Sequence, residues 1–157
     1  MRSQPAINIR PLAESDLPRV LRIAESANEA PRWPRQTFVE MLSGEFLSRR
    51  IALVATDSGS GEALGFAVAS LVPPEAELEN IAVAREVQRR GIGRLLLSEL
   101  VQELRHAGIE TLLLEVRASN SAAIDLYSSF GFNESGRRSR YYSSPVEDAV
   151  LMTLKLR

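Results

Sequence analysis

Two periodicities of hydrophobic and polar positions divide the chain into strands and helices. Alternation of period two, or a short apolar run between turn residues, predicts a strand, and apolar residues three or four positions apart predict a helix. The strand patterns lie at residues 7–10, 50–55, 63–69, 78–83, 111–117, 137–142 and 147–152. The helical patterns run from 15 to 27, from 35 to 42, from the turn at 88–94 to Gly108, and between Asn120 and Gly131. A break from Glu29 to Pro34 separates the first two helices and contains the only tryptophan, Trp33.

The order of these elements predicts a single domain, residues 1–157, built on a mixed sheet. The second and third strands are joined across a glycine- and serine-rich turn and form an antiparallel hairpin. The fourth strand, the helix after it and the fifth strand form a right-handed strand–helix–strand unit, which makes these two strands parallel. The last two strands form a closing antiparallel pair. No repeat, linker or low-complexity tract divides the chain.

The stretch Gln-Arg-Arg-Gly-Ile-Gly-Arg at 88–94 has the features of an anion site. It precedes a helix, whose first N–H groups lack acceptors within the helix and lie at the positive end of its dipole. Gly91 and Gly93 let a ligand approach the backbone, and three arginines add positive charge. The stretch lacks the Gly-Lys-Ser/Thr of a P-loop and the third glycine of a dinucleotide fingerprint. It therefore predicts a phosphate or diphosphate site of another kind.

Composition and charge exclude several classes of function. The chain has 157 residues, of which 45% are apolar and 25% charged, as in an ordinary globular protein. Its formal net charge of −1 argues against broad binding to nucleic acid or a membrane surface, and no apolar run is long enough to span a bilayer. The absence of cysteine excludes thiolate catalysis and cysteine-ligated metals, and the single His106 lies near a helix end. Residues 1–5 lack the apolar segment of a signal peptide, so we expect a cytoplasmic protein without a metal.

Two candidate catalytic residues lie in the second half of the chain. Glu115 is near the carboxyl end of the apolar run at 111–117, and ligands of strand–helix–strand units bind beyond such ends. Tyr127 lies on the helix that follows. By residue type alone, Glu115 is more often a strand-end carboxylate paired with Arg117 or Arg140, and Tyr127 more often part of the core.

Three motifs together resemble the GNAT superfamily of acyl-CoA N-acyltransferases. They are the glycine stretch at 88–94, Leu-Glu-Val-Arg-Ala-Ser-Asn at 114–120, and Ala-x-x-Leu-Tyr-x-x-x-Gly-Phe at 123–132. With Arg-x-x-Tyr-Tyr and Glu-Asp-Ala near the end, they are most similar to the RimI-type ribosomal-protein alanine N-acetyltransferases, within the N-terminal acetyltransferase branch. The match is dense from Glu75 to Phe132 and loose before it. The resemblance implies an α/β (α+β) GNAT-like fold, with a mixed, mostly antiparallel sheet of about seven strands, a central parallel pair and about four flanking helices.

The resemblance also implies the roles of individual residues. Acetyl-CoA would be the cosubstrate, held by Ile81, Ala82, Val83, Arg89, Arg90, Gly91, Ile92, Gly93, Arg94 and Asn120. Glu115 would be the general base and Tyr127 the general acid of a direct transfer. The acceptor would be a protein or peptide N-terminus, such as that of a ribosomal protein beginning with alanine. The residues that would bind it are Trp33, Glu79, Tyr141 and Tyr142.

Two positions depart from the family pattern, both on the acceptor side. Pro34 replaces the usual Ser/Thr after the tryptophan, and Glu79 stands where an apolar residue is expected. We therefore expect a more acidic acceptor pocket than is usual in the family.

The chemistry of acyl transfer to an amine agrees with these roles. An α-amino group titrates near about 8 and a lysine near about 10.4, so an α-amine is easier to neutralise at cytosolic pH. A carboxylate in partly apolar surroundings has a raised pKa and can take that proton, which suits Glu115, with Glu77 and Glu79 as rival bases. A tyrosine hydroxyl, with a pKa of about 10, can protonate a leaving thiolate of pKa about 8.5.

Three functions remain open from the sequence. The first is an N-terminal protein acetyltransferase, and the second is a GNAT enzyme acting on a small amine, an antibiotic or a lysine side chain. The third is a CoA-binding domain without turnover, against which Glu115 and Tyr127 argue. The pair Tyr141-Tyr142, which can wall a narrow peptide slot, favours the first.

Overall fold

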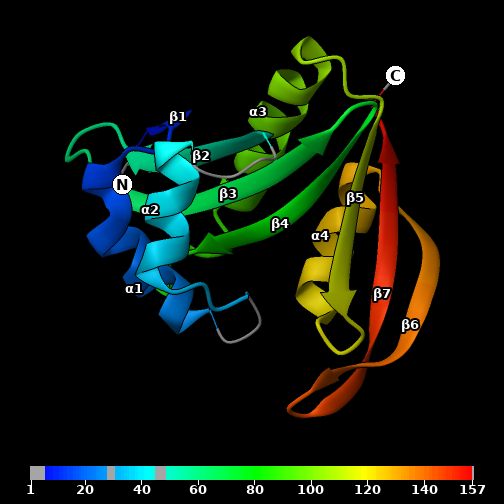
Figure 1. The fold of residues 1–157 in the computed structure, drawn as a ribbon. Helices are drawn as coiled ribbons and strands as arrows, with labels where there is room; N and C mark the ends of the chain where they lie inside the picture. Colours follow the sequence, from blue (N-terminus) through cyan, green and yellow to red (C-terminus); the bar gives the residue numbers. More distant parts are fainter. Residues whose placement is uncertain (1–5, 28–30, 45–48, 157) are drawn as a thin grey trace.

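A sheet of seven strands organises the part of the chain that the structure, a computed structural model, describes: residues 6–27, 31–44 and 49–156. The strands are β1 (Ile7–Pro11), β2 (Arg49–Asp57), β3 (Ala63–Val72), β4 (Glu75–Val83), β5 (Thr111–Arg117), β6 (Asn133–Ser143) and β7 (Val146–Lys155). Their spatial order is β1-β2-β3-β4-β5-β7-β6, with β4 and β5 parallel and the other neighbours antiparallel (Figure 1). This confirms the predicted mixed sheet with a central parallel pair. Residues 1–5 and the first part of the break at 29–34 lie outside the described residues.

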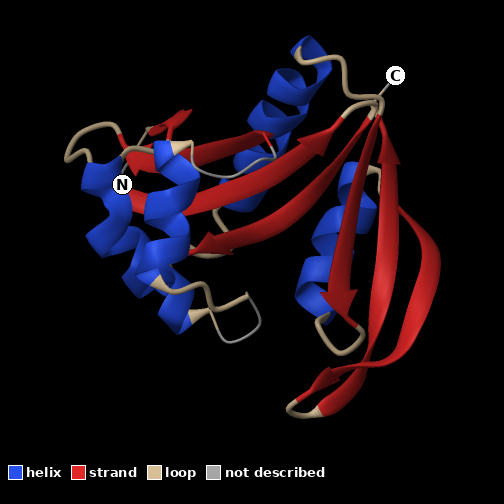
Figure 2. Ribbon diagram, in the orientation of Figure 1, coloured by secondary structure: helices blue, strands red, loops and turns tan. Residues whose placement is uncertain are grey.

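Helices cover both faces of the sheet (Figure 2). Those described are α1 (Leu17–Ser26), α2 (Arg35–Ser43), α3 (Ile92–His106) and α4 (Ser121–Phe130), with single 3-10 turns η1 (Glu14–Asp16) and η2 (Arg85–Val87). The four predicted helices are therefore present. Several strands are longer than predicted: β4 begins at Glu75 and β6 at Asn133. Backbone pairing in these strands continues past the apolar residues from which the strands were predicted.

The two faces of β3 contact different helices. The ring of Phe66 lies 5.7 Å from that of Phe38 in α2, centre to centre. A Cβ placed on the preceding residue, Gly65, would lie 3.4 Å from Leu96 of α3. Because neighbouring residues of a strand point to opposite faces, α2 covers one face of the sheet and α3 the other.

A β-bulge at Glu79 divides β4 into two halves. Leu78 is opposite Ala69 and Asn80 is opposite Val68, so Glu79 has no residue of β3 directly opposite. The extra residue shifts the alternation by one position. Asn80 consequently points to the α2 face, as the residues before the bulge at positions 75 and 77 do, while Ile81 and Val83 point to the α3 face.

The parallel pair of strands is short. β4 and β5 pair only between Glu75–Glu77 and Thr111–Leu113. Beyond these residues the two strands diverge, as the separation of their arrows in Figure 1 shows. The carboxyl-terminal halves of β4 and β5 therefore have no strand between them, and the candidate site residues Ile81, Val83 and Glu115 lie in these halves.

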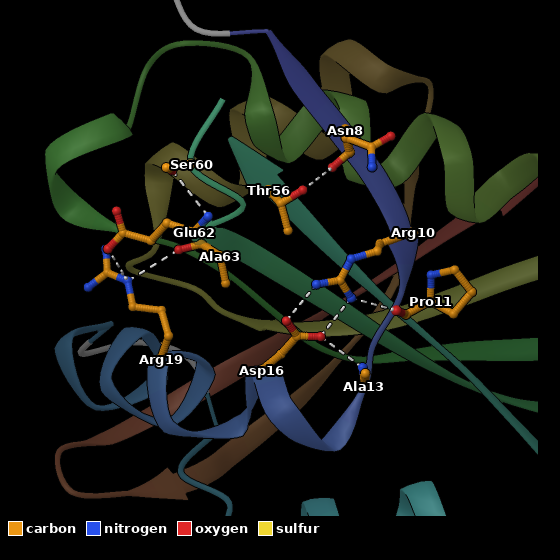
Figure 3. Close-up of polar contacts among 10 residues, drawn as sticks. All are labelled: Asn8, Arg10, Pro11, Ala13, Asp16, Arg19, Thr56, Ser60, Glu62 and Ala63. Atoms are coloured by element: carbon orange, nitrogen blue, oxygen red, sulfur yellow. Dashed lines mark hydrogen bonds and ion pairs between the residues drawn. The ribbon is translucent and has the colours of Figure 1, made fainter. Parts of the chain in front are cut away.

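An ion pair ties β1 to the start of α1 (Figure 3). Two nitrogens of Arg10 each donate a hydrogen bond of 2.7 Å to the carboxylate of Asp16, and the N–H of Ala13 donates a third at 2.8 Å. The side chain of Asp16 is 8% exposed. The hydrogen bonds from Arg10 hold the pKa of Asp16 below its usual value.

Candidate active site

The N-terminus of α3 presents unpaired backbone donors. Gly91 is its N-cap, with φ +79°, and Arg89 also has a positive φ of +63°. Among the described residues, the N–H groups of 89–94 donate no hydrogen bond. A Cβ on Gly91 would meet nothing within 4 Å, so the space beside this loop is open. The expected anion site therefore has the geometry of a helix N-terminus with free donors.

The three arginines of this loop differ in their contacts. Arg94 donates hydrogen bonds to the carbonyl and hydroxyl oxygens of Ser129 at 3.3 and 3.2 Å, and lies 5.6 Å from the ring centre of Phe130. It joins α3 to α4. Arg89 and Arg90 are exposed and make no ion pair with a described residue. These two guanidinium groups are available to an anion.

The end of β4 contacts this glycine loop. The side chain of Gln88 donates a hydrogen bond of 3.2 Å to the carbonyl of Val83. A Cβ on Gly93 would lie 3.2 Å from Leu126 of α4 and 4.0 Å from Val83. Gly93 is thus a contact point between β4, α3 and α4 as well as part of the glycine loop.

α4 begins with the predicted cap and carries a buried tyrosine. The side chain of Asn120 accepts a hydrogen bond of 3.0 Å from the N–H of Ala123, and Gly131 ends the helix with φ +116°. Tyr127 is 6% exposed and its ring lies 5.6 Å from that of Phe132. Its hydroxyl makes no hydrogen bond with a described residue, and burial raises its pKa to about 12. Tyr127 is therefore a neutral hydrogen-bond donor at physiological pH.

Glu115 lies on β5 with 22% of its side chain exposed. Its Oε1 is 3.2 Å from Nε of Arg138 on β6. The pairing with Arg117 or Arg140 considered from the sequence is wrong, because Arg117 pairs with Glu147 and Arg140 lies in the irregular stretch of β6 between Arg138 and Tyr142. The charge of Glu115 and a hydrogen bond to it raise the pKa of Tyr141. The carboxylate is thus paired with Arg138 of β6, which forms a hairpin with β7.

The two rival carboxylates on β4 have different surroundings. Glu79 accepts two hydrogen bonds from Arg50 of β2, at 2.8 and 3.2 Å. Arg50 offsets its charge, so Glu79 adds less acidity to the acceptor side than we expected. Partial burial and the nearby charges of Glu115 and Glu79 raise the pKa of Glu77. Glu77 is therefore the stronger of the two rivals to Glu115.

The predicted aromatic acceptor residues belong to two different contacts. Tyr141 and Tyr142 contact each other edge to face, with ring centres 5.1 Å apart. Trp33 packs on Phe38 at 5.4 Å, on the face of the sheet that α2 covers. The predicted acceptor residues are thus divided among the segment before α2, strand β4 with Glu79, and the β6–β7 hairpin.

Several contact residues were missed in the sequence. Asn80, 2% exposed, donates a hydrogen bond of 3.3 Å to the carbonyl of Pro31, close to Trp33. Three of these residues are polar residues within predicted strands: Asn80, Arg138 and Arg50. A polar residue inside a strand pattern is the sequence signal that could have identified them as contact residues. Among the described residues, no three His, Cys, Asp or Glu side chains form a group that could hold a metal ion, and no helix is long and apolar enough to span a membrane.

Comparison with known proteins places this chain in a family. Residues 17–132 match the model of the acetyltransferase (GNAT) family. The [ribosomal protein bS18]-alanine N-acetyltransferase of Escherichia coli K12 is 41% identical over 94% of this chain and 97% of its own. Its counterpart in Salmonella typhimurium is 43% identical over 92% and 95%. The crystal structure of the ribosomal-protein-S18-alanine N-acetyltransferase from Escherichia coli superposes with a TM-score of 0.83 at 40% identity, covering 96% of this chain and 94% of that one. The chain therefore belongs to the GNAT family of acetyltransferases.

Proposed function

We propose that this acetyltransferase transfers the acetyl group of acetyl-CoA directly to the N-terminal α-amino group of a protein, and that the acceptor is a ribosomal protein beginning with alanine. The observation that carries the proposal is the ion pair of Glu115 with Arg138, whose guanidinium also lies 5.5 Å from the ring centre of Tyr141, so the candidate base is joined to the aromatic pair of the β6–β7 hairpin. The names of the bS18-alanine N-acetyltransferases that resemble the chain over most of its length support the same acceptor. A ribosomal-protein acceptor also implies that the reaction occurs in the cytoplasm.

The residues expected to hold acetyl-CoA fit that molecule. The unpaired N–H groups of 89–94 and the side chains of Arg89 and Arg90 suit its diphosphate. Ile81 and Val83 point to the same face as α3 and lie on the half of β4 that has left β5. The thioester would enter along this half-strand, and Tyr127 on α4 lies on the same side of the sheet.

Glu115 would accept the proton of the incoming ammonium group. Arg138 occupies one oxygen of Glu115 before the acceptor arrives, so we propose that the ammonium group displaces this guanidinium. The neutral nitrogen then attacks the thioester carbonyl, the C–N bond forms, the C–S bond breaks, and the second proton of the nitrogen is released to the bulk as the amide forms. Because an α-amino group is less basic than a lysine by about 2.4 pKa units, the same carboxylate neutralises it more easily.

Tyr127 would assist the leaving thiolate. Its phenol, with a pKa of about 12, is a weaker acid than a thiol of pKa about 8.5. Complete proton transfer to the thiolate would be uphill by about 5 kcal/mol. We therefore propose that Tyr127 acts mainly by donating a hydrogen bond to the developing thiolate, which takes its proton from the bulk afterwards.

A peptide-panel assay tests this function. An alanine-initiated peptide with a basic second or third residue is compared with its Nα-blocked, lysine-containing counterpart, and mass spectrometry locates the acetyl group. We expect modification of the α-amine, at least about tenfold faster than of lysine, because of the difference in basicity. A preference for the blocked peptide, or for a simple polyamine, would show that the acceptor is a lysine or a small amine.

A further inference from the structure

Glu147, the second residue of β7, contacts two parts of the site that are distant in the sequence. Its Oε1 accepts a hydrogen bond of 2.6 Å from the N–H of Ser119, and its Oε2 lies 3.3 Å from a guanidinium nitrogen of Arg117. Only 12% of its side chain is exposed. Hydrogen bonds from Ser119, with the charge of Arg117, lower the pKa of Glu147, so the carboxylate is ionised at neutral pH.

The first contact fixes the start of α4. Ser119 belongs to the turn between β5 and α4, and the preceding residue, Ala118, donates its N–H to the carbonyl of Asp148 at 3.0 Å. Two successive N–H groups therefore hold the turn on β7. The next residue is the helix cap Asn120, and the helix carries Tyr127. The positions of Asn120, a proposed acetyl-CoA residue, and of the helix that carries Tyr127 depend on this turn.

The second contact fixes a wall of the proposed acceptor site. The guanidinium of Arg117 lies 4.2 Å from the ring centre of Tyr142, which is the geometry of a cation–π contact. One of its nitrogens also donates a hydrogen bond of 3.4 Å to the carbonyl of Pro145. Because Glu147 holds the same guanidinium, it keeps Arg117 against Tyr142, whose ring in turn contacts Tyr141.

We propose that Glu147 is a positioning residue for the acceptor side of the reaction, acting through Arg117 on Tyr142. One carboxylate holds the turn that begins α4 and, through Arg117, the orientation of Tyr142. This inference rests on the proposed function, since it concerns the same site.

Kinetics of Glu147→Gln test this role of the Arg117 contact while the Ser119 contact is kept. Glutamine keeps the size of the side chain and an oxygen for Ser119, but it lacks the charge that holds Arg117. We expect the KM for an alanine-initiated peptide to rise about tenfold, while the KM for acetyl-CoA changes by less than about twofold. Tyr142→Ala should raise the peptide KM as well, and the double variant should be no worse than Tyr142→Ala alone, because the two residues act through one contact. Glu134→Gln, which removes the carboxylate of the exposed pair with Arg137, should leave both KM values unchanged.

NMR provides a readout that does not depend on the acceptor. The Nε–H signal of Arg117 can be assigned by its loss in Arg117→Lys. In the parent protein, the ring of Tyr142 should shift this signal upfield. In Glu147→Gln it should move toward the value of an exposed arginine. An unchanged signal, an unchanged peptide KM, or additive effects in the double variant would each overturn the inference. An unmodified protein that acetylates no peptide N-terminus would instead refute the proposed function itself.

Discussion

Replacement of Asp16 by asparagine should destabilise the fold by an amount that the structure allows us to estimate. Asp16 is 8% exposed and accepts three hydrogen bonds, two from Arg10 and one from the N–H of Ala13. Asparagine has one oxygen, and its NH₂ group must face one of these donors. Breaking a buried pair costs about 3 to 5 kcal/mol, and because Arg10 is partly exposed we expect about 2 to 3 kcal/mol. For a chain of this size that loss lowers the Tm by about 5 to 10 °C.

Differential scanning calorimetry at several pH values checks both the size and the origin of the effect. The folded-state pKa of Asp16 is lowered, so its stabilisation is complete above the unfolded pKa of about 3.9 and is lost as the pH falls through the folded value. The Tm difference between the two proteins should therefore be constant from about pH 7 to about pH 5 and shrink below about pH 4. Glu134→Gln, in an exposed ion pair, should change the Tm by less than about 2 °C. A Tm for Asp16→Asn within about 2 °C of the parent, or a difference that persists undiminished in acid, would show that the ion pair does not stabilise the fold.

Three further predictions concern catalysis and cofactor binding. Glu115→Gln should lower kcat by about a hundredfold or more with CoA binding retained, and Glu77→Gln should lower kcat less. If steady-state kinetics show the larger loss of kcat for Glu77→Gln, Glu77 is the base. Tyr127→Phe should lower kcat by about a hundredfold without lowering the Tm, since the hydroxyl has no partner among the described residues, and full activity would exclude its role in leaving-group departure. Gly91→Ala and Gly108→Ala impose similar backbone strain, with φ +79° and +82° and open space at both sites, but only Gly91→Ala should weaken CoA binding by calorimetry, by about tenfold or more. Equal affinities of these two variants would mean that the diphosphate does not bind at the glycine loop.

Features that depend on local sequence could be predicted. The helical spacing of Leu96 and Leu100 and the glycine beyond the last turn identified α3, because burial of one helix face and a positive φ at Gly108 are determined within a few residues. The cap at Asn120 was predicted for the same reason. The strand–helix–strand rule then supplied the parallel pair of β4 and β5.

Contacts that depend on register could not be predicted. Glu115 pairs with Arg138 across the intervening strand β7, and Arg140 lies in a bulge of β6, where it has φ +54°, which no sequence pattern marked. Arg50 and Glu79 lie on strands that are separated by β3, so their ion pair depends on how far each side chain reaches across the sheet. The charges around the candidate base are therefore a property of the folded sheet.

The bulge at Glu79 has a consequence for how the protein can change in evolution. It separates β4 into a part that presents Glu77 to the proposed acceptor side and a part that presents Ile81 and Val83 to the proposed acetyl-CoA side. Substitutions before the bulge can alter the choice of acceptor without changing which side chains of β4 face each side of the sheet after the bulge. Deletion of a single residue at the bulge would instead turn every later side chain of the strand to the opposite face. Variation among relatives should accordingly consist of replacements at positions 77 and 79, with the length of this strand kept constant.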